Sequence, residues 1–162
     1  MCYCVNDFNL IIEMIALSAE QIKEIAEQLE VGFDCFLNKH NSELIFLRGD
    51  EDDFLGVEED DAWADARKKI NDNPDDYYTI EKMGPRDSFS VMEEFAHTID
   101  SGRLKEELIR ALNHKKPFRQ FKYLIDDSGE YRQKWFDFKS KKMIEWVVAE
   151  LDLINMNEEE DK

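Results

Sequence analysis

The apolar residues of this chain change their spacing along the sequence, and that change constrains the fold more than any other feature. Before Gly84, aromatic and branched residues gather in short runs of the kind that form strands, and two helical segments are interspersed with these runs. After residue 86 the apolar residues recur every three or four positions, as they do along the buried face of a helix. The pattern predicts an α+β fold, in which a small antiparallel sheet with two helices is followed by a four-helix C-terminal part.

Three runs are predicted to supply the strands of the sheet. Phe33 to Leu37 and Glu43 to Leu47 are separated by five polar, turn-forming residues, which favours a β-hairpin. In Tyr77 to Met83, tyrosine, isoleucine and methionine alternate with polar residues. This alternation is typical of a half-buried strand and predicts the third one.

The starts of several helices are marked by residues that cap free backbone N–H groups. Ser18 and Gln21 form a capping box ahead of an apolar stripe that ends at Gly32, and Ser90 and Glu93 show the same spacing. A proline suits the first turn of a helix because its missing N–H has no partner to lose there. Helices are therefore predicted after Ser18, over Trp63 to Asn71, after Ser90, along Leu104 to Leu112, after Pro117 and from Asp127 to Leu151.

The chain length predicts one domain. At 162 residues and 43% hydrophobic composition, the chain suffices for one core and is short for two. The domain is expected over 18–155, with a mixed half at 18–84 and a helical half at 86–155. Residues 1–17 are assigned to an N-terminal extension and 156–162 to an acidic tail that frays.

Charge and cysteine content restrict the partners and the compartment. With 38 acidic and 21 basic residues, the net charge of −17 opposes non-specific binding of the whole chain to nucleic acid or anionic membrane. Cys2, Cys4 and Cys35 are odd in number and fit free thiols in the cytoplasm better than a disulfide framework. The longest apolar run, Leu10 to Leu17, is interrupted by Glu13 and is too short to cross a bilayer. The apolar face of Phe8 to Leu17 could join two copies of the chain in a homo-oligomer.

A group of short motifs between Ser101 and Leu151 resembles a bacterial group known only as uncharacterised protein family 0158. The residues that carry the resemblance are Arg103-Leu104, Ala111-Leu112, Pro117-Phe118-Arg119-Gln120-Phe121-Lys122 and Trp135-Phe136-Asp137-Phe138. The helix and hairpin from Leu17 to Leu47 also resemble the opening of that family. Its members often have a glycine-bearing turn where this chain has residues 113–116. The resemblance implies a fold and a domain boundary, and it implies no activity and no site.

No catalytic residue, metal site or cofactor is predicted from the motifs. Cys2-x-Cys4 lacks nearby residues that would complete a tetrahedral zinc site. In the acidic segment 49–61, counting from Asp50 puts Leu55 where a calcium-binding EF-hand loop requires glycine. The chain also has no Gly-x-Ser-x-Gly motif and no glycine-rich phosphate loop.

An enzyme remains the alternative function. It would be a metal-assisted hydrolase that uses carboxylates such as Asp50, Asp52 and Glu93 together with His97, which lies one turn after Glu93. Convergence of these side chains in one cleft would favour the enzyme, whereas separate exposure to solvent would count against it.

One region departs from the acidic character of the chain. From 103 to 142 there are twelve basic and six acidic residues, a local balance of +6. One interpretation is a basic, aromatic face that binds nucleic acid or an acidic protein. The other is that the aromatic residues form the core and the cations pair with the chain's own acidic half. The leading hypothesis is a non-catalytic binding or adaptor domain, with candidate binding residues Lys115, Lys116, Arg119, Lys122 and Trp135.

Overall fold

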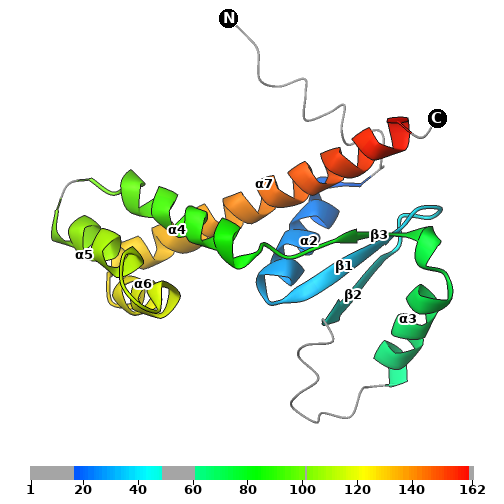
Figure 1. Cartoon of the computed structure of the whole chain (residues 1–162), viewed down its shortest axis with the longest axis horizontal. Coiled ribbons are helices and arrows are strands. Elements are labelled where there is room, and N and C mark those ends of the chain that lie inside the picture. Colours follow the sequence, from blue (N-terminus) through cyan, green and yellow to red (C-terminus); the bar gives the residue numbers. More distant parts are fainter. Residues whose placement is uncertain (1–16, 49–60, 101, 161–162) are drawn as a thin grey trace, which may run out of the picture. The chain divides into compact units, whose positions relative to one another are not determined.

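The computed structural model describes residues 17–48, 61–100 and 102–160 (Figure 1). The elements in chain order are α2 (Ala19–Glu30), β1 (Phe33–Asn38), β2 (Leu44–Arg48), α3 (Asp61–Asp72), a 3₁₀ helix η2 (Pro74–Asp76), β3 (Tyr77–Ile80), α4 (Pro85–Thr98), α5 (Arg103–Leu112), α6 (Pro117–Asp126) and α7 (Glu130–Glu160). The predicted α+β class is confirmed. The predictions for residues 1–16 and 49–60, which include Cys2, Cys4, Asp50 and Asp52, lie outside the described residues.

The chain divides into two compact units. One extends up to Lys82 and resumes at Met143, and the other comprises Met83–Lys142. The long helix α7 therefore contributes its first part to the second unit and its later part to the first. The sequence had assigned the whole of 86–155 to one helical half. None of the described helices combines the length and apolar character that a membrane crossing requires.

The first unit is built on a three-stranded antiparallel sheet in the order β2-β1-β3, so the predicted hairpin and third strand are both confirmed. Phe36 pairs with Ile45 on one side and with Thr79 on the other. Because successive residues of a strand face opposite ways, Phe36 and its cross-strand neighbours lie on the face that packs against α3. Cys35 and Leu37 are fully buried on the opposite face, which contacts α2.

The buried thiol of Cys35 belongs to this core. Burial raises the pKa of the Cys35 thiol to about 12, and the carboxylate of Glu24 on α2 adds to the rise. At neutral pH the side chain is therefore a small apolar group, without the thiolate that metal binding and redox chemistry use.

The later part of α7 is attached to the first unit by burial and by one hydrogen bond. Val147 and Leu151 are buried, and the indole Nε1 of Trp146 donates to the carbonyl oxygen of Glu81 at 2.9 Å. The helix continues to Glu160, so residues 156–160, assigned from the sequence to a frayed tail, are helical.

One predicted capping box is confirmed and the other is wrong. Ser18 Oγ accepts from the backbone N–H of Gln21 at 3.2 Å, while Gln21 Oε1 accepts from the N–H of Ser18 at 2.9 Å. The helix predicted to begin at Ser90 begins at Pro85 instead, and Ser90 Oγ donates within it to the carbonyl of Arg86 at 3.2 Å. The reason is that Pro85, with its φ already helical, occupies the first turn and makes a later start unnecessary.

The second unit has a core formed by α4, α5 and α6, with the first part of α7 packed against it. Its buried members are Met92, Phe95, Ala96, Ile99, Leu108, Leu112, Phe121 and Ile125. Trp135 and Phe138 of α7 are partly buried and make ring contacts with this group, with ring centroids 5.2 and 5.5 Å from that of Phe95. The interpretation in which the aromatic residues of 103–142 form the core is wrong for Phe118, because its side chain is 44% exposed.

Candidate anion-binding face

Helix α6 has one side buried in the core and its other sides facing outward. Phe121 and Ile125, four residues apart, point into the core, and each is only 1% exposed. Residues on the other sides of the helix are consequently turned outward. They include Arg119 and Lys122, which were predicted from the sequence, and also Phe118 and Tyr123.

The turn that leads into α6 places two more cations beside it. Lys115 and Lys116 are exposed in the connection after α5. Lys116 is the N-cap residue of α6 and has a left-handed backbone, with φ of 57°. A side chain disfavours this conformation, which costs roughly 1–2 kcal/mol for a residue other than glycine. The lysine lies in the turn, residues 113–116, for which the resemblance to family 0158 implied a different geometry in this chain.

We expect Lys116→Gly to raise the free energy of unfolding by about 0.5–1 kcal/mol, because glycine adopts the left-handed region without the steric penalty but loses more chain entropy on folding. Lys115→Gly is the matched control. It removes the same charge from the neighbouring residue, whose φ is not positive, and should slightly lower stability. Equal effects of the two changes in urea denaturation would contradict the assigned turn geometry.

Most cations around this turn are neutralised by partners within the same unit. Four ion pairs are short: Arg103 Nε–Glu107 Oε1 at 2.7 Å, Arg132 Nε–Asp126 Oδ1 at 3.4 Å, Lys134 Nζ–Glu130 Oε2 at 3.4 Å and Lys142 Nζ–Glu94 Oε2 at 2.6 Å. Lys105 Nζ donates to the carbonyl oxygens of His97 and Ile99 at the end of α4, at 3.3 and 2.9 Å. These cations stabilise the unit internally.

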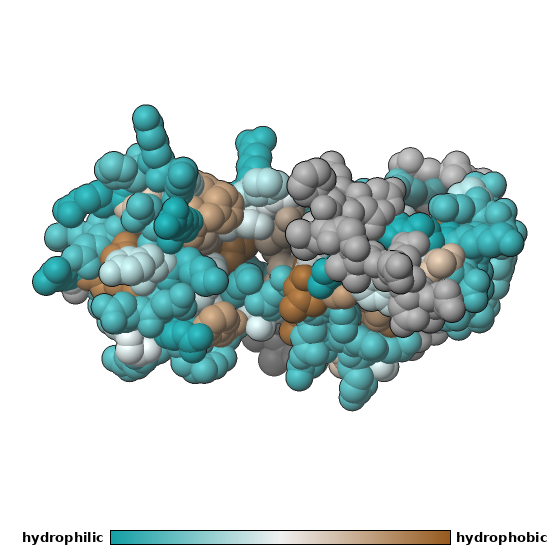
Figure 2. All heavy atoms as spheres, turned by 90° about the horizontal axis from the view of Figure 1, so that it is seen from below, coloured by the Kyte–Doolittle hydropathy of each residue, from teal (hydrophilic) through white to brown (hydrophobic). Residues whose placement is uncertain are grey.

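Four cations of the α6 region have no such partner among the described residues. Lys115, Lys116, Arg119 and Lys122 are exposed, and none forms an ion pair with a carboxylate in the part of the chain that the structure describes. Two facts account for this: no acidic residue occurs between Glu107 and Asp126, and Asp126, one turn after Lys122, pairs with Arg132. We call these four residues the α6 basic face. Hydrophilic side chains cover most of this end of the molecule, on the left in Figure 2, with apolar patches among them.

Trp135, the fifth candidate from the sequence, lies with the core. Its ring centroid is 4.9 Å from that of Phe121, in an edge-to-face arrangement. The structure therefore brings the four cations together around α6 and places the indole against the inner side of that helix. Sequence reasoning missed Tyr123, which is 73% exposed. Its position two residues after Phe121 and four after Arg119 could have indicated an outward orientation.

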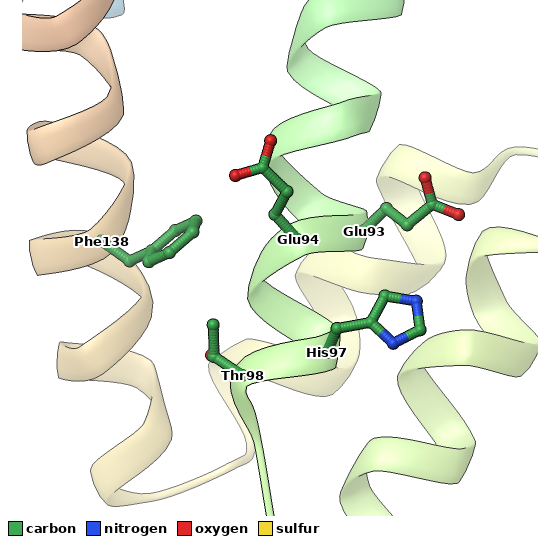
Figure 3. A pocket seen from close by; sticks show the side chains of 5 residues that line it. All are labelled: Glu93, Glu94, His97, Thr98 and Phe138. Atoms are coloured by element: carbon green, nitrogen blue, oxygen red, sulfur yellow. The ribbon is translucent and has the colours of Figure 1, made fainter.

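The residues of the enzyme alternative that can be located do not assemble a metal site. Glu93 and His97 project from one side of α4, while Glu94 points toward Phe138 of α7 (Figure 3). These residues line an open hollow together with Thr98. Within the described ranges, no group of three or more His, Cys, Asp or Glu side chains could hold a metal ion. Two potential ligands leave a coordination sphere incomplete, since structural zinc takes four and catalytic zinc three from the protein.

Comparison with known proteins gives the chain a family. The model of the uncharacterised protein family UPF0158 matches residues 10–161. The UPF0158 protein PA5073 of Pseudomonas aeruginosa is 23% identical over 132 residues, which cover 81% of this chain and 80% of that protein. No solved structure matches the chain. The family match includes both compact units and nearly the whole sequence, and the chain belongs to the uncharacterised protein family UPF0158.

Proposed function

We propose that this protein is a non-catalytic binding or adaptor domain that engages an anionic partner through the α6 basic face. The observation that carries the proposal is the sorting of charges within the second unit. Arg103 of α5 and three cations of α7 meet carboxylates at 2.6–3.4 Å, whereas Lys115, Lys116, Arg119 and Lys122 meet none among the described residues. Four clustered like charges repel one another, and an anionic partner would relieve that repulsion.

The net charge of −17 does not prevent such binding. At 0.1 M ionic strength, interactions between exposed charges are largely screened beyond about 10 Å. A partner that contacts α6 therefore experiences mainly the local cations and the nearby ion pairs, which are close to neutral. The overall acidity still repels polyanions that approach elsewhere, so it restricts binding to this face.

The chemistry of the four side chains supports binding without catalysis. Ammonium and guanidinium groups donate hydrogen bonds to phosphate or carboxylate oxygens, and at neutral pH they have no free acceptor that could serve as a general base. Arg119 can hold two oxygens at once through its planar fork, while the three lysines act as point charges. We expect the protein to work in the cytoplasm, a compartment in which its buried Cys35 thiol stays reduced.

Reversing the charge of the face should abolish this binding. We expect wild-type protein to bind inorganic polyphosphate at low salt and Arg119→Glu/Lys122→Glu to bind more than about tenfold more weakly, since two attractive contacts become repulsive. The matched control is Lys23→Glu/Lys134→Glu, which makes the same change in net charge at two exposed lysines that already pair with Glu27 and Glu130. The control should retain most of the affinity.

The affinity of all three proteins for polyphosphate is measured by isothermal titration calorimetry. An equal loss of affinity in both double variants would show that only net charge matters, and the proposed face would be wrong. Lack of binding by wild-type protein at low salt would have the same consequence. Circular dichroism of the variants confirms that each is folded, which is expected because all four substituted side chains are exposed.

A further inference from the structure

We infer that the anionic partner of the α6 basic face is a single-stranded nucleic acid, whose phosphates lie on Arg119 and Lys122 and whose bases stack on Phe118 and Tyr123. The inference rests on the proposed function and names the class of its ligand. It comes from a second set of side chains, the aromatic rings of α6, which play no part in the charge argument.

Phe118 and Tyr123 are large aromatic side chains that remain open to solvent. They are 44% and 73% exposed, although the same helix buries Phe121 almost completely. Each lies one helical turn from a cation of the face, Phe118 before Lys122 and Tyr123 after Arg119. Residues four apart are neighbours on a helix surface, so the two cations lie between the two rings on the outer side of α6, each beside one of them.

Apart from Phe89, which is partly buried against the core, the other aromatic residues of this unit already have partners for their rings. Arg132 lies over Phe136, Lys134 over Tyr131 and Lys142 over Phe138, with the cation 4.6–5.6 Å from the ring centroid. Phe95, Phe121 and Trp135 contact one another in the core. Within the described residues, Phe118 and Tyr123 have neither a cation over the ring nor an aromatic neighbour. The two exposed rings without partners thus occur on the same helix as Arg119 and Lys122.

A single-stranded nucleic acid can contact the exposed rings and the unpaired cations at the same time. Its backbone repeats a negative charge at every nucleotide, and its unstacked bases offer flat faces to aromatic side chains. An acidic peptide would neutralise the cations but has no regular supply of flat groups for the rings. A duplex keeps its base faces covered by stacking, so an α-helix in its groove meets only base edges, on which aromatic rings cannot stack. The combination of open rings and open cations therefore favours the single strand.

The test separates the contribution of the rings to binding from that of the charges. The double variant Phe118→Leu/Tyr123→Leu keeps an apolar side chain at both positions and removes the aromatic faces. We expect it to bind a labelled single-stranded RNA of mixed sequence at least about fivefold more weakly than wild type, since stacking on one base is worth roughly that factor or more. Its affinity for inorganic polyphosphate, which has no bases, should be unchanged. Tyr123→Phe keeps the ring and should bind RNA like wild type.

Salt dependence supplies a second readout in the same fluorescence-anisotropy titrations. Arg119→Glu/Lys122→Glu should lower the slope of log affinity against log salt, because fewer counterions are released. The leucine double variant should keep the wild-type slope, because rings displace no counterions. The duplex of the same sequence should bind more weakly than the single strand.

The outcomes distinguish this inference from the proposed function. Polyphosphate binding that depends on Arg119 and Lys122, combined with RNA binding indifferent to the loss of both rings, would overturn the nucleic-acid assignment. An acidic protein would then be the partner class, and the anion-binding function would stand. Loss of polyphosphate binding in the leucine variant would also overturn the assignment, since it would give the rings a role unrelated to bases. If charge reversal affects neither ligand, both proposals fail.

Discussion

Replacing Phe121 with alanine should lower the free energy of unfolding by about 3–5 kcal/mol, the usual cost of truncating a large buried aromatic side chain. Phe121 is 1% exposed, and its ring contacts those of Phe95 and Trp135 with centroids 6.5 and 4.9 Å away. The change would therefore leave a cavity at the point where α6 meets α4 and α7. A domain of ordinary stability has only about 5–15 kcal/mol in total, so chemical denaturation should detect the loss readily.

Phe118→Ala is the matched control for this change. It removes the same side chain from the same helix, three residues earlier, where the ring is 44% exposed. Its effect should be smaller, about 1–2 kcal/mol, because nearly half of the ring surface is already exposed to water. A similar loss in both variants would contradict the orientation of α6, and with it the outward position of the basic face.

Truncating Ile80 to alanine should cost about 2–5 kcal/mol in the first unit, the range observed for buried isoleucine and leucine. Ile80 is the last residue of β3, is 0% exposed and lies directly opposite Cys35 of β1. Its side chain therefore belongs to the buried face of the sheet that contacts α2.

Thr79→Ala provides the comparison within the same strand. The threonine is exposed and points to the opposite face, so only its β-propensity is lost, worth up to about 1 kcal/mol. The prediction is checked by urea denaturation followed by circular dichroism. If Thr79→Ala destabilised the protein as much as Ile80→Ala, the register of β3 on β1 would be wrong.

The strands were predictable because their signals are local. Five polar residues between two apolar runs are sufficient to predict the hairpin, and the alternation after Tyr77 identifies the third strand. The start of α4 was missed because Ser90 and Glu93 match a capping box by spacing alone, while Pro85 defines the earlier start. The division of α7 between two units depends on long-range packing, which local patterns do not encode.

The basic residues of the face were predictable, but their isolation from carboxylates was not. Sequence composition gives a balance of +6 for residues 103–142 and cannot tell which cations find partners. The folded structure determines which cations are paired. Arg103 and Lys134 each contact a carboxylate one helical turn away, and Arg132 contacts Asp126, six residues earlier. Arg119 has no acidic residue within a turn, and Asp126, one turn after Lys122, pairs with Arg132 instead. Phe118 was assigned to the core because it precedes Phe121 by three residues, although the stripe of α6 continues through Ile125 instead.

Membership in UPF0158 adds no chemical role, so the central claim depends on where a ligand binds. The most direct measurement is a titration of isotope-labelled protein with single-stranded RNA, followed by backbone amide NMR shifts. The account predicts perturbations concentrated in the turn and outer side of α6, from Lys115 to Tyr123, with little change in β1, β2 and β3. Perturbations centred on the sheet, or absent from α6 at low salt, would contradict it.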